Sequence, residues 1–355
     1  MVINNFSITK LLSNYLLYNT RFILNINMIF VFIIVSSSLF AQETAIKKNI
    51  ARDDYFTIKT ATDKVRKKYP FAEPAQLKES EKVNVFKNLT YASIGERELH
   101  LDIFQPNKII GPLTTILMIH GGGWRSGDRS MEYPMAEQLA EKGYISVTVE
   151  YRLSPETLYP AAVYDLKAAV RWLRANAKKF NIDPGKIVAY GCSSGGHLAT
   201  LLGVTNGRGN FEGEMGNLDY SSMVQGIVNV DGPLDLTHPE ESFEIEDSSK
   251  STSAAQWLGC TFKEKPELWM EASPMNYVTE ETPPIAFINS SLEEYHVGRD
   301  HMIDKLKFYK IYYELNTITD SPHTIWLFHP WFKKTLEYVN KFLDKVFNDA
   351  NGLLK

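Results

Sequence analysis

Cysteine is scarce in this chain of 355 residues, which contains only Cys192 and Cys260. So few cysteines exclude a disulfide framework, and they also exclude a zinc site with four cysteine ligands. Cys192 lies inside a glycine- and serine-rich turn sequence, where a small apolar side chain fills space well. We therefore expect Cys192 to be a buried filler residue.

Clusters of basic residues, internal repeats and long low-complexity tracts are also missing. Lysine and arginine together number 38 and aspartate and glutamate 42, which gives a net charge of −4. A chain without a basic patch has no electrostatic footprint for nucleic acid, so we expect no nucleic-acid partner. The length suffices for one large α/β domain or two small ones.

Long apolar runs are absent except for one near the N-terminus, over residues 28–41. This run is short for a membrane span, ends in small residues, and follows Lys10 and Arg21 with no acidic residue among residues 1–41. That pattern is typical of a signal peptide, with a membrane anchor as the alternative. We expect residues 1–41 to be a signal peptide, with translation starting at Met1 or Met28, and the protein to be exported to the periplasm or secreted, without stable membrane association.

The remaining chain predicts a linker and peripheral segment over residues 42–82 and one main domain over residues 83–355. Polar and apolar residues alternate on both sides of Gly95, which predicts an antiparallel strand pair with one solvated face. Five further strands are predicted, at residues 114–120, 144–151, 187–190, 224–231 and 284–290. Residues 114–120 form a nearly continuous apolar run, as expected of a strand covered on both faces. Helices are predicted between or after these strands, at residues 131–142, 159–174 and 300–315.

This order predicts an α/β fold with a mostly parallel central sheet and helices on both faces. Residues 232–281 have mixed polarity and are too few for a domain. We expect them to form a small cap-like insertion that shapes one wall of a pocket.

The sequence Gly191-Cys192-Ser193-Ser194-Gly195 lies between a strand-like run and an apolar, alanine-bearing run. In a strand–turn–helix context, G-x-S-x-G holds a nucleophilic serine in a strained turn with its hydroxyl exposed. The pattern alone is weak, but here its context is present. It predicts Ser193 as a nucleophile and the Ser194 N–H, at a helix N-terminus, as a donor to an oxyanion.

A second glycine-rich motif, His120-Gly121-Gly122-Gly123-Trp124, follows the first buried strand. Three consecutive glycines allow backbone N–H groups to turn inward without obstruction by side chains. A plain glycine turn is the alternative. The motif precedes G-x-S-x-G by one strand unit, so we expect Gly121 and Gly122 to complete an oxyanion hole.

A serine nucleophile needs a histidine base and a carboxylate that orients it, in the chain order serine, acid, histidine. The histidine candidates after the last predicted strand are His323 and His329, and we favour His323 because it follows Ser-Pro in a loop. The acid candidates after the strand ending at residue 290 are Glu293, Glu294 and Asp300. Glu293 has the more usual spacing, whereas Asp300 opens a predicted helix.

In combination the motifs resemble the α/β-hydrolase superfamily, in particular hormone-sensitive-lipase-like esterases and bacterial feruloyl and acetylxylan esterases. The resemblance covers residues 83–346 and implies that Ser193 is the nucleophile and His323 the base. Many relatives carry Gly-x-x-Asp where this chain has Ser290-Ser-Leu-Glu293, and the sequence His296-Val-Gly-Arg-Asp300 keeps Asp300 as the alternative acid. Besides the two glycine motifs, the resemblance rests on Tyr151-Arg-Leu-Ser, Tyr159-Pro-Ala and Asp165.

The resemblance implies a secreted serine carboxylic-ester hydrolase that removes acyl groups, with acetyl as the expected group, from a plant-type polysaccharide. An acylated carbohydrate would be the substrate, with no metal or organic cofactor. Trp124, Tyr295 and Trp326 are expected to stack on sugar rings, and packing in the core is the alternative for each. Other readings are a general carboxylesterase for small acyl or lipid-like substrates and a non-catalytic binding protein with this fold. The sequence leaves the polysaccharide and the oligomeric state open.

Overall fold

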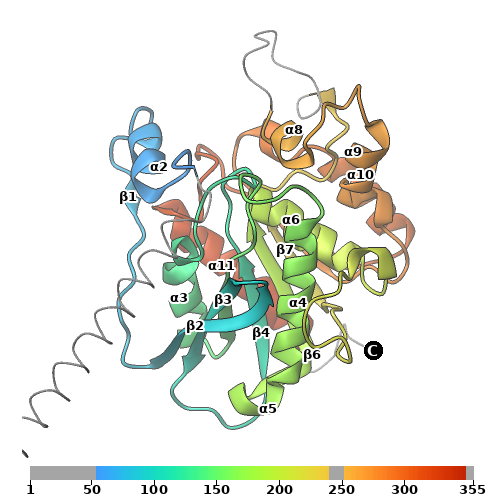
Figure 1. The fold of residues 1–355 in the computed structure, drawn as a ribbon. Helices are drawn as coiled ribbons and strands as arrows, with labels where there is room; N and C mark the ends of the chain where they lie inside the picture. The colour runs from blue at the N-terminus through green and yellow to red at the C-terminus, as the bar shows by residue number, and fades with distance from the viewer. Residues whose placement is uncertain (1–52, 240–251, 349–355) are drawn as a thin grey trace, which may run out of the picture. The chain divides into compact units, whose positions relative to one another are not determined.

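The computed structural model describes residues 53–239 and 252–348 (Figure 1). These residues belong to one compact unit. The predicted signal peptide, residues 1–41, lies outside the described residues. None of the described helices has the length and apolarity that crossing a bilayer requires.

A central eight-stranded sheet organises the unit, and seven of its strands follow the predicted order along the chain, whereas the eighth, Tyr313–Thr317, was not predicted. The first two strands pair antiparallel, the second strand also pairs antiparallel with β5, and all later pairs are parallel. The mostly parallel sheet is thus confirmed. Across the sheet the strands are β2 (Val83–Ile94), β3 (Arg97–Pro106), β5 (Ile145–Val149), β4 (Leu113–Ile119), β6 (Ile182–Cys192), β7 (Gly226–Val230), β8 (Ile285–Asn289) and β9 (Tyr313–Thr317).

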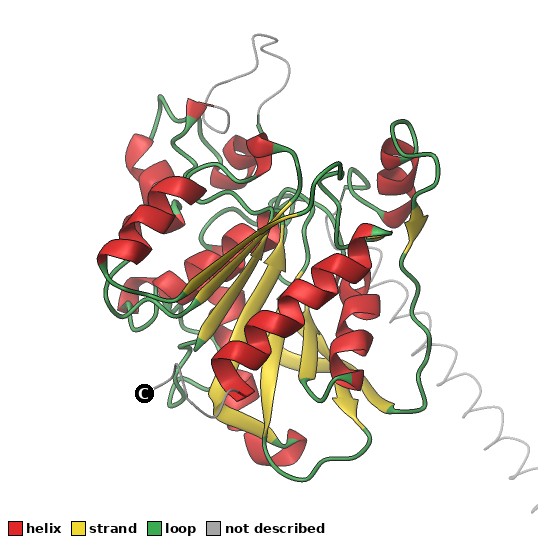
Figure 2. Cartoon of the chain, turned by 180° about the vertical axis from the view of Figure 1, so that it is seen from behind, coloured by secondary structure: helices red, strands yellow, loops and turns green. Residues whose placement is uncertain are grey.

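Helices cover both faces of this sheet (Figure 2). Successive residues of β4 alternate between two apolar clusters, with Ile116 in one and Leu117 in the other. Period-two alternation between two covered faces is why the buried strands read as continuous apolar runs. One face carries α3 (Tyr133–Glu141) and α11 (Trp331–Leu343), and the other carries α4 (Ala161–Ala175), α6 (Ser194–Val204) and α10 (Arg299–Phe308).

The segment before residue 83 packs onto the same compact unit. Helix α2 (Ile58–Val65) starts at the capping residue Thr57, and β1 (Glu73–Pro74) pairs with β10 (Phe328–His329). Tyr69 is 5% exposed and meets the Trp331 ring edge-on, with 4.9 Å between ring centroids. The described part of the predicted linker, residues 53–82, is therefore anchored to the domain.

Two other segments refine the sequence expectations. The helix predicted over residues 300–315 ends at Phe308, because Lys310 adopts a positive φ of 58° and the chain then enters β9 at the sheet edge. The expected insertion carries α8 (Ser253–Leu258) and α9 (Pro266–Glu271), and its Trp257 and Trp269 are fully buried.

Candidate active site

Ser193 lies at the turn between β6 and α6 with φ 54° and ψ −125°. Its backbone N–H donates to the Val230 carbonyl at 2.8 Å, which ties the turn to the neighbouring strand. A Cβ at Gly191 would lie 2.0 Å from the Gly195 carbonyl oxygen, and a Cβ at Gly195 would lie 2.1 Å from that of Ile119. Only glycine fits at these two positions, so the strained turn predicted from G-x-S-x-G is present.

The glycine loop after β4 lies directly against this turn. A Cβ at Gly121 would lie 2.8 Å from the Cys192 carbonyl oxygen and 3.2 Å from the Ser193 Cβ. Gly122 has a φ of 130°, and the backbone N–H of Ser126 donates to its carbonyl at 3.0 Å. The Ser126 hydroxyl donates to the same carbonyl at 2.8 Å. These bonds hold the loop beside the serine.

The oxyanion donors in the structure differ in part from the predicted ones. Gly122 and Ser194 line the cavity that contains Ser193, and Gly123 joins them, whereas Gly121 packs behind the loop. Within the described residues, no group accepts a hydrogen bond from the backbone N–H of Gly122, Gly123 or Ser194. Unpaired N–H groups at a helix N-terminus and in a glycine loop are suited to bind a developing negative charge.

His323 is the histidine that lines this cavity, as favoured from the sequence. Its Nδ1 lies 3.1 Å from the Oδ2 of Asp231, a fully buried carboxylate directly after β7. The Asp231 Oδ1 accepts the Ser290 backbone N–H at 2.8 Å. A carboxylate on Nδ1 fixes the tautomer in which Nε2 is the acceptor, as a general base requires. His329 instead lies exposed in β10, opposite Glu73.

The acid predictions therefore differ from the structure. Glu293 and Glu294 are exposed in a short 3₁₀ helix, and the Asp300 side chain is 78% exposed and paired with Arg299 at 2.8 Å. Sequence reasoning missed Asp231 because it searched one strand later. The available signal was an aspartate at the carboxyl end of the apolar run 224–231, next to the nucleophile strand in the sheet.

The aromatic predictions separate into two groups. Trp124 is 3% exposed and stacks on Trp257 with 5.0 Å between centroids, and Trp326 is 1% exposed. Trp326 does not line the cavity and packs in the core, whereas Trp124 packs in the core and also contributes to the cavity lining. Tyr295 is half-buried, lines the cavity and stacks on the His323 ring with centroids 3.6 Å apart. It is the one of the three placed to touch both the base and a ligand.

His197, four residues after the serine, is a buried structural histidine. Its Nε2 lies 2.8 Å from the Ala272 carbonyl, and its Nδ1 accepts the Trp124 indole N–H at 3.3 Å. Burial lowers the pKa of His197 to about 4, so the ring is neutral near pH 7. It joins α6, the glycine loop and the insertion to one another.

The cavity above Ser193 has a volume of about 450 Å³, which is the size of a small-molecule site. The insertion contributes Pro233 and Ser253 to the lining, so its expected role as a pocket wall is confirmed. The segment before residue 83 contributes a further wall, which the sequence analysis did not foresee. Within residues 53–239 and 252–348, no cluster of three His, Cys, Asp or Glu side chains is arranged to hold a metal ion.

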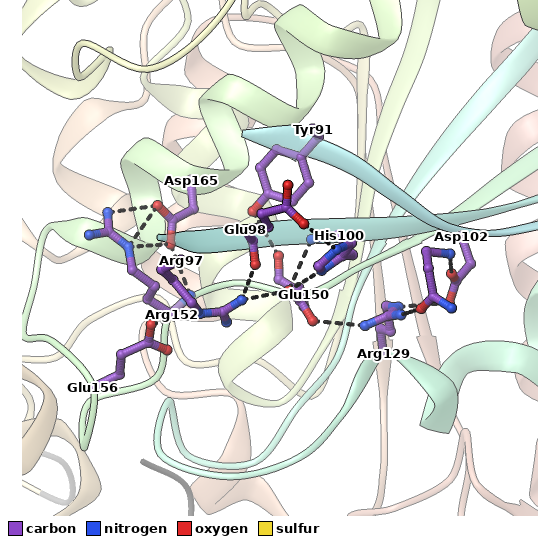
Figure 3. Close-up of polar contacts among 11 residues, drawn as sticks. Tyr91, Arg97, Glu98, His100, Asp102, Arg129, Glu150, Arg152, Glu156 and Asp165 are labelled. Atoms are coloured by element: carbon purple, nitrogen blue, oxygen red, sulfur yellow. Dashed lines mark hydrogen bonds and ion pairs between the residues drawn. The ribbon is translucent and has the colours of Figure 1, made fainter. Parts of the chain in front are cut away.

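A network of largely buried ion pairs lies among residues of β3 and the segments after the glycine loop and β5 (Figure 3). Arg129, just after the loop, contacts Asp102 and Glu150 at 2.7 Å each. Burial favours the neutral form of Glu150, but hydrogen bonds from His100 and Arg97 and the arginine charges outweigh it and lower its pKa to about 2. Arg152 pairs with the buried Asp165 at 2.7 Å. Arg152 and Asp165, which belong to the sequence motifs named above, thus stabilise the fold through an ion pair.

A family model provides the decisive comparison. The BD-FAE model matches residues 101–296, which is more than half of the chain. The chain belongs to the BD-FAE family. The matched range includes both glycine motifs and Asp231 and ends before His323.

The BD-FAE chain is also similar to named esterases. It is 30% identical over 184 residues to Esterase LipC of Mycobacterium tuberculosis. The aligned residues cover 51% of this chain and 44% of LipC. The chain thus spans less than half the length of that relative.

Solved structures support the α/β-hydrolase esterase fold. The truncated form of a carbohydrate esterase from gut microbiota has a TM-score of 0.64 at 26% identity, covering 76% of this chain and 99% of that one. A bifunctional GH43-CE protein of Bacteroides eggerthii also has a TM-score of 0.64, at 25% identity, covering 74% of this chain and 38% of that one.

Proposed function

We propose that this protein is a serine carboxylic-ester hydrolase with Ser193 as nucleophile, His323 as base and Asp231 as the acid that orients the base. The observation that carries the proposal is a single cavity lined by Ser193 at a strained turn and by His323, whose Nδ1 is held by a buried carboxylate. The esterase names of the relatives support the same reading.

In the proposed reaction, the Ser193 hydroxyl attacks the ester carbonyl while Nε2 of His323 takes its proton. The N–H groups of Gly122, Gly123 and Ser194 stabilise the oxyanion, and each such donor typically contributes about 3 kcal/mol to the transition state. His323 then protonates the leaving alcohol. Water, deprotonated by His323, attacks the acyl-serine and releases the acid.

We further propose an acylated plant-type polysaccharide as the substrate, with acetyl as the acyl group. The structural neighbour named a carbohydrate esterase and the bifunctional GH43-CE neighbour support this class. A general carboxylesterase for small acyl or lipid-like substrates is the second candidate, and the similarity to LipC favours it. Export directed by residues 1–41 belongs to the same proposal, and N-terminal sequencing of the mature protein tests it.

The experiment compares acetate release from acetylated xylan and acetylated pectin with hydrolysis of methyl ferulate and p-nitrophenyl acetate. The protein tested contains residues 42–355, and Ser193→Ala is the control. Faster turnover of a polymer than of p-nitrophenyl acetate, with an inactive Ser193→Ala variant, supports the carbohydrate esterase. Turnover of p-nitrophenyl acetate alone leaves the general esterase.

A non-catalytic protein would behave differently in two measurements. Wild type and Ser193→Ala would be equally inactive on all four substrates. The wild-type protein would also resist labelling by a serine-directed fluorophosphonate, which reacts only with an activated serine hydroxyl.

A further inference from the structure

The wall that the N-terminal segment adds to the cavity carries two lysines. Lys64 and Lys68 both line the cavity that contains Ser193 and His323. They are four residues apart, and backbone bonds such as Tyr69 N–H to the Val65 carbonyl at 2.9 Å continue the helical turn between them. The two amino groups therefore extend from one side of the segment.

The segment is fixed on the domain, so these charges have a defined place. Ala61, Val65 and Tyr69 are buried in the cluster beneath α11, and the Tyr69 hydroxyl donates to Asp320 at 3.2 Å. The Lys68 amino group lies over the Tyr69 ring, 4.9 Å from its centroid. The wall thus presents both apolar side chains, such as Val65 and Tyr69, and the two lysines to the cavity.

Among residues 53–239 and 252–348, no carboxylate forms an ion pair with Lys64 or Lys68, although Tyr69 and, more weakly, the charge of Asp320 raise the pKa of Lys68. The ion pairs of the segment join Lys59 to Asp63 and Arg66 to Glu73. Within the described residues, Lys64 and Lys68 make no ion pair, and no aspartate or glutamate is among the residues that line the cavity. A cavity lined by charge of one sign raises the local concentration of a ligand of opposite charge.

We propose that the ester taken by this site is borne by a carbohydrate with a carboxylate, such as an acylated uronic acid, and that Lys64 and Lys68 bind that carboxylate. The proposal rests on the proposed ester hydrolysis. A phosphate fits less well, because phosphate sites commonly use free backbone N–H groups at a helix N-terminus. At the start of α2 part of this set is engaged, since the Thr57 hydroxyl accepts the Thr60 N–H at 3.1 Å and the Thr57 carbonyl accepts the Ala61 N–H at 2.9 Å.

The test uses acetylated oligogalacturonates with free carboxylates and the same oligosaccharides after methyl esterification, which removes the charge. Acetate release gives kcat/KM for each, and their ratio measures the preference for the charged form. For the wild type we expect a ratio above one that falls between 50 and 500 mM NaCl, because salt screens exposed charges. In Lys64→Gln/Lys68→Gln the ratio should fall about fivefold, as expected for two partly exposed ion pairs.

The matched control is Lys67→Gln/Lys78→Gln, which removes the same charge from exposed lysines that do not line the cavity. It should keep the wild-type ratio. An equal rate on both oligosaccharides, or the same fall in the control variant, would overturn the proposal. Hydrolysis of p-nitrophenyl acetate by the wild type, lost in Ser193→Ala, tests the ester-hydrolase function separately, so the two failures are distinguishable.

Discussion

Asp231 supplies a carboxylate to His323 from inside the protein, where no solvent competes for the interaction. Its side chain is fully buried and its two oxygens are used by different partners, His323 on Oδ2 and the Ser290 N–H on Oδ1. Glu293 is exposed on the next loop of the sheet edge. Residue type and spacing in the sequence could not tell which carboxylate orients His323. The answer depends on which strand of the sheet ends beside the loop that carries His323.

The first prediction concerns this choice of acid. Asp231→Asn keeps the side-chain shape but removes the charge that holds the His323 tautomer, so kcat on p-nitrophenyl acetate should fall about 10⁴-fold. Glu293→Gln and Asp300→Asn are the matched variants and should stay within about twofold of wild type. A large loss of activity in either control variant, with Asp231→Asn still active, would show that Glu293 or Asp300 is the acid, as the sequence predicted.

Glu132 is another buried carboxyl, and unlike Asp231 it has no hydrogen-bond partner among the described residues. Burial raises its pKa to about 8. The folded protein therefore keeps Glu132 protonated near pH 7. In the unfolded chain its pKa has the ordinary value of 4.5, so the carboxyl is ionised at any pH well above that.

The second prediction follows from that difference. Between about pH 5 and pH 8 the unfolded state binds fewer protons at this site, so the free energy of unfolding falls as pH rises, by up to about 1.4 kcal/mol per pH unit. Glu132→Gln removes this titration and should flatten the profile measured by urea denaturation. Glu267→Gln, at an exposed carboxyl, should keep the wild-type slope. Parallel profiles for wild type and Glu132→Gln would contradict the assignment.

At the scale of elements, the glycine loop is held between two differently built supports. On one side it packs against the Ser193 turn, and on the other it leads into Arg129, which joins Asp102 and Glu150. The loop motif was readable from the sequence because glycine requirements are local. The support was not readable in this way, because Arg129 follows the loop while its partners Asp102 and Glu150 lie in β3 and directly after β5.

The third prediction tests that support. Arg129→Met leaves the buried Asp102 and Glu150 without one cationic partner, and should lower the free energy of unfolding by about 3 kcal/mol in urea denaturation. Lys59→Met is the control, because it breaks an ion pair whose side chains are 86% and 66% exposed and should produce no measurable change. Equal effects of the two variants would show that burial of the network is not what matters.

At the scale of the whole molecule, the order of strands and helices along the chain and the strand–turn–helix around Ser193 were largely predictable, because each element rests on a continuous stretch of sequence. The place of residues 53–82 was not predictable, because the segment is held by residues distant in the sequence, among them Glu137 and, more than 200 residues away, the C-terminal part of the chain. Tyr69 packs on Trp331, and β1 pairs with β10. A charged, weakly periodic segment gives no local sign that its few apolar residues are buried by the C-terminal helix.

The last prediction asks whether this long-range contact holds the cavity wall in place. Tyr69→Ala removes a buried ring, its edge-on contact with Trp331 and its hydrogen bond to Asp320, so the segment around α2 should open more often. Trypsin should then cleave at Lys64, Lys67 or Lys68 about tenfold faster. Tyr220→Ala, at a tyrosine that is 45% exposed, is the control and should keep the wild-type rate. If opening is local, faster cleavage appears while the circular dichroism of the sheet is unchanged. Cleavage that accelerates only when the whole protein unfolds would mean that the segment is bound to the domain through other contacts.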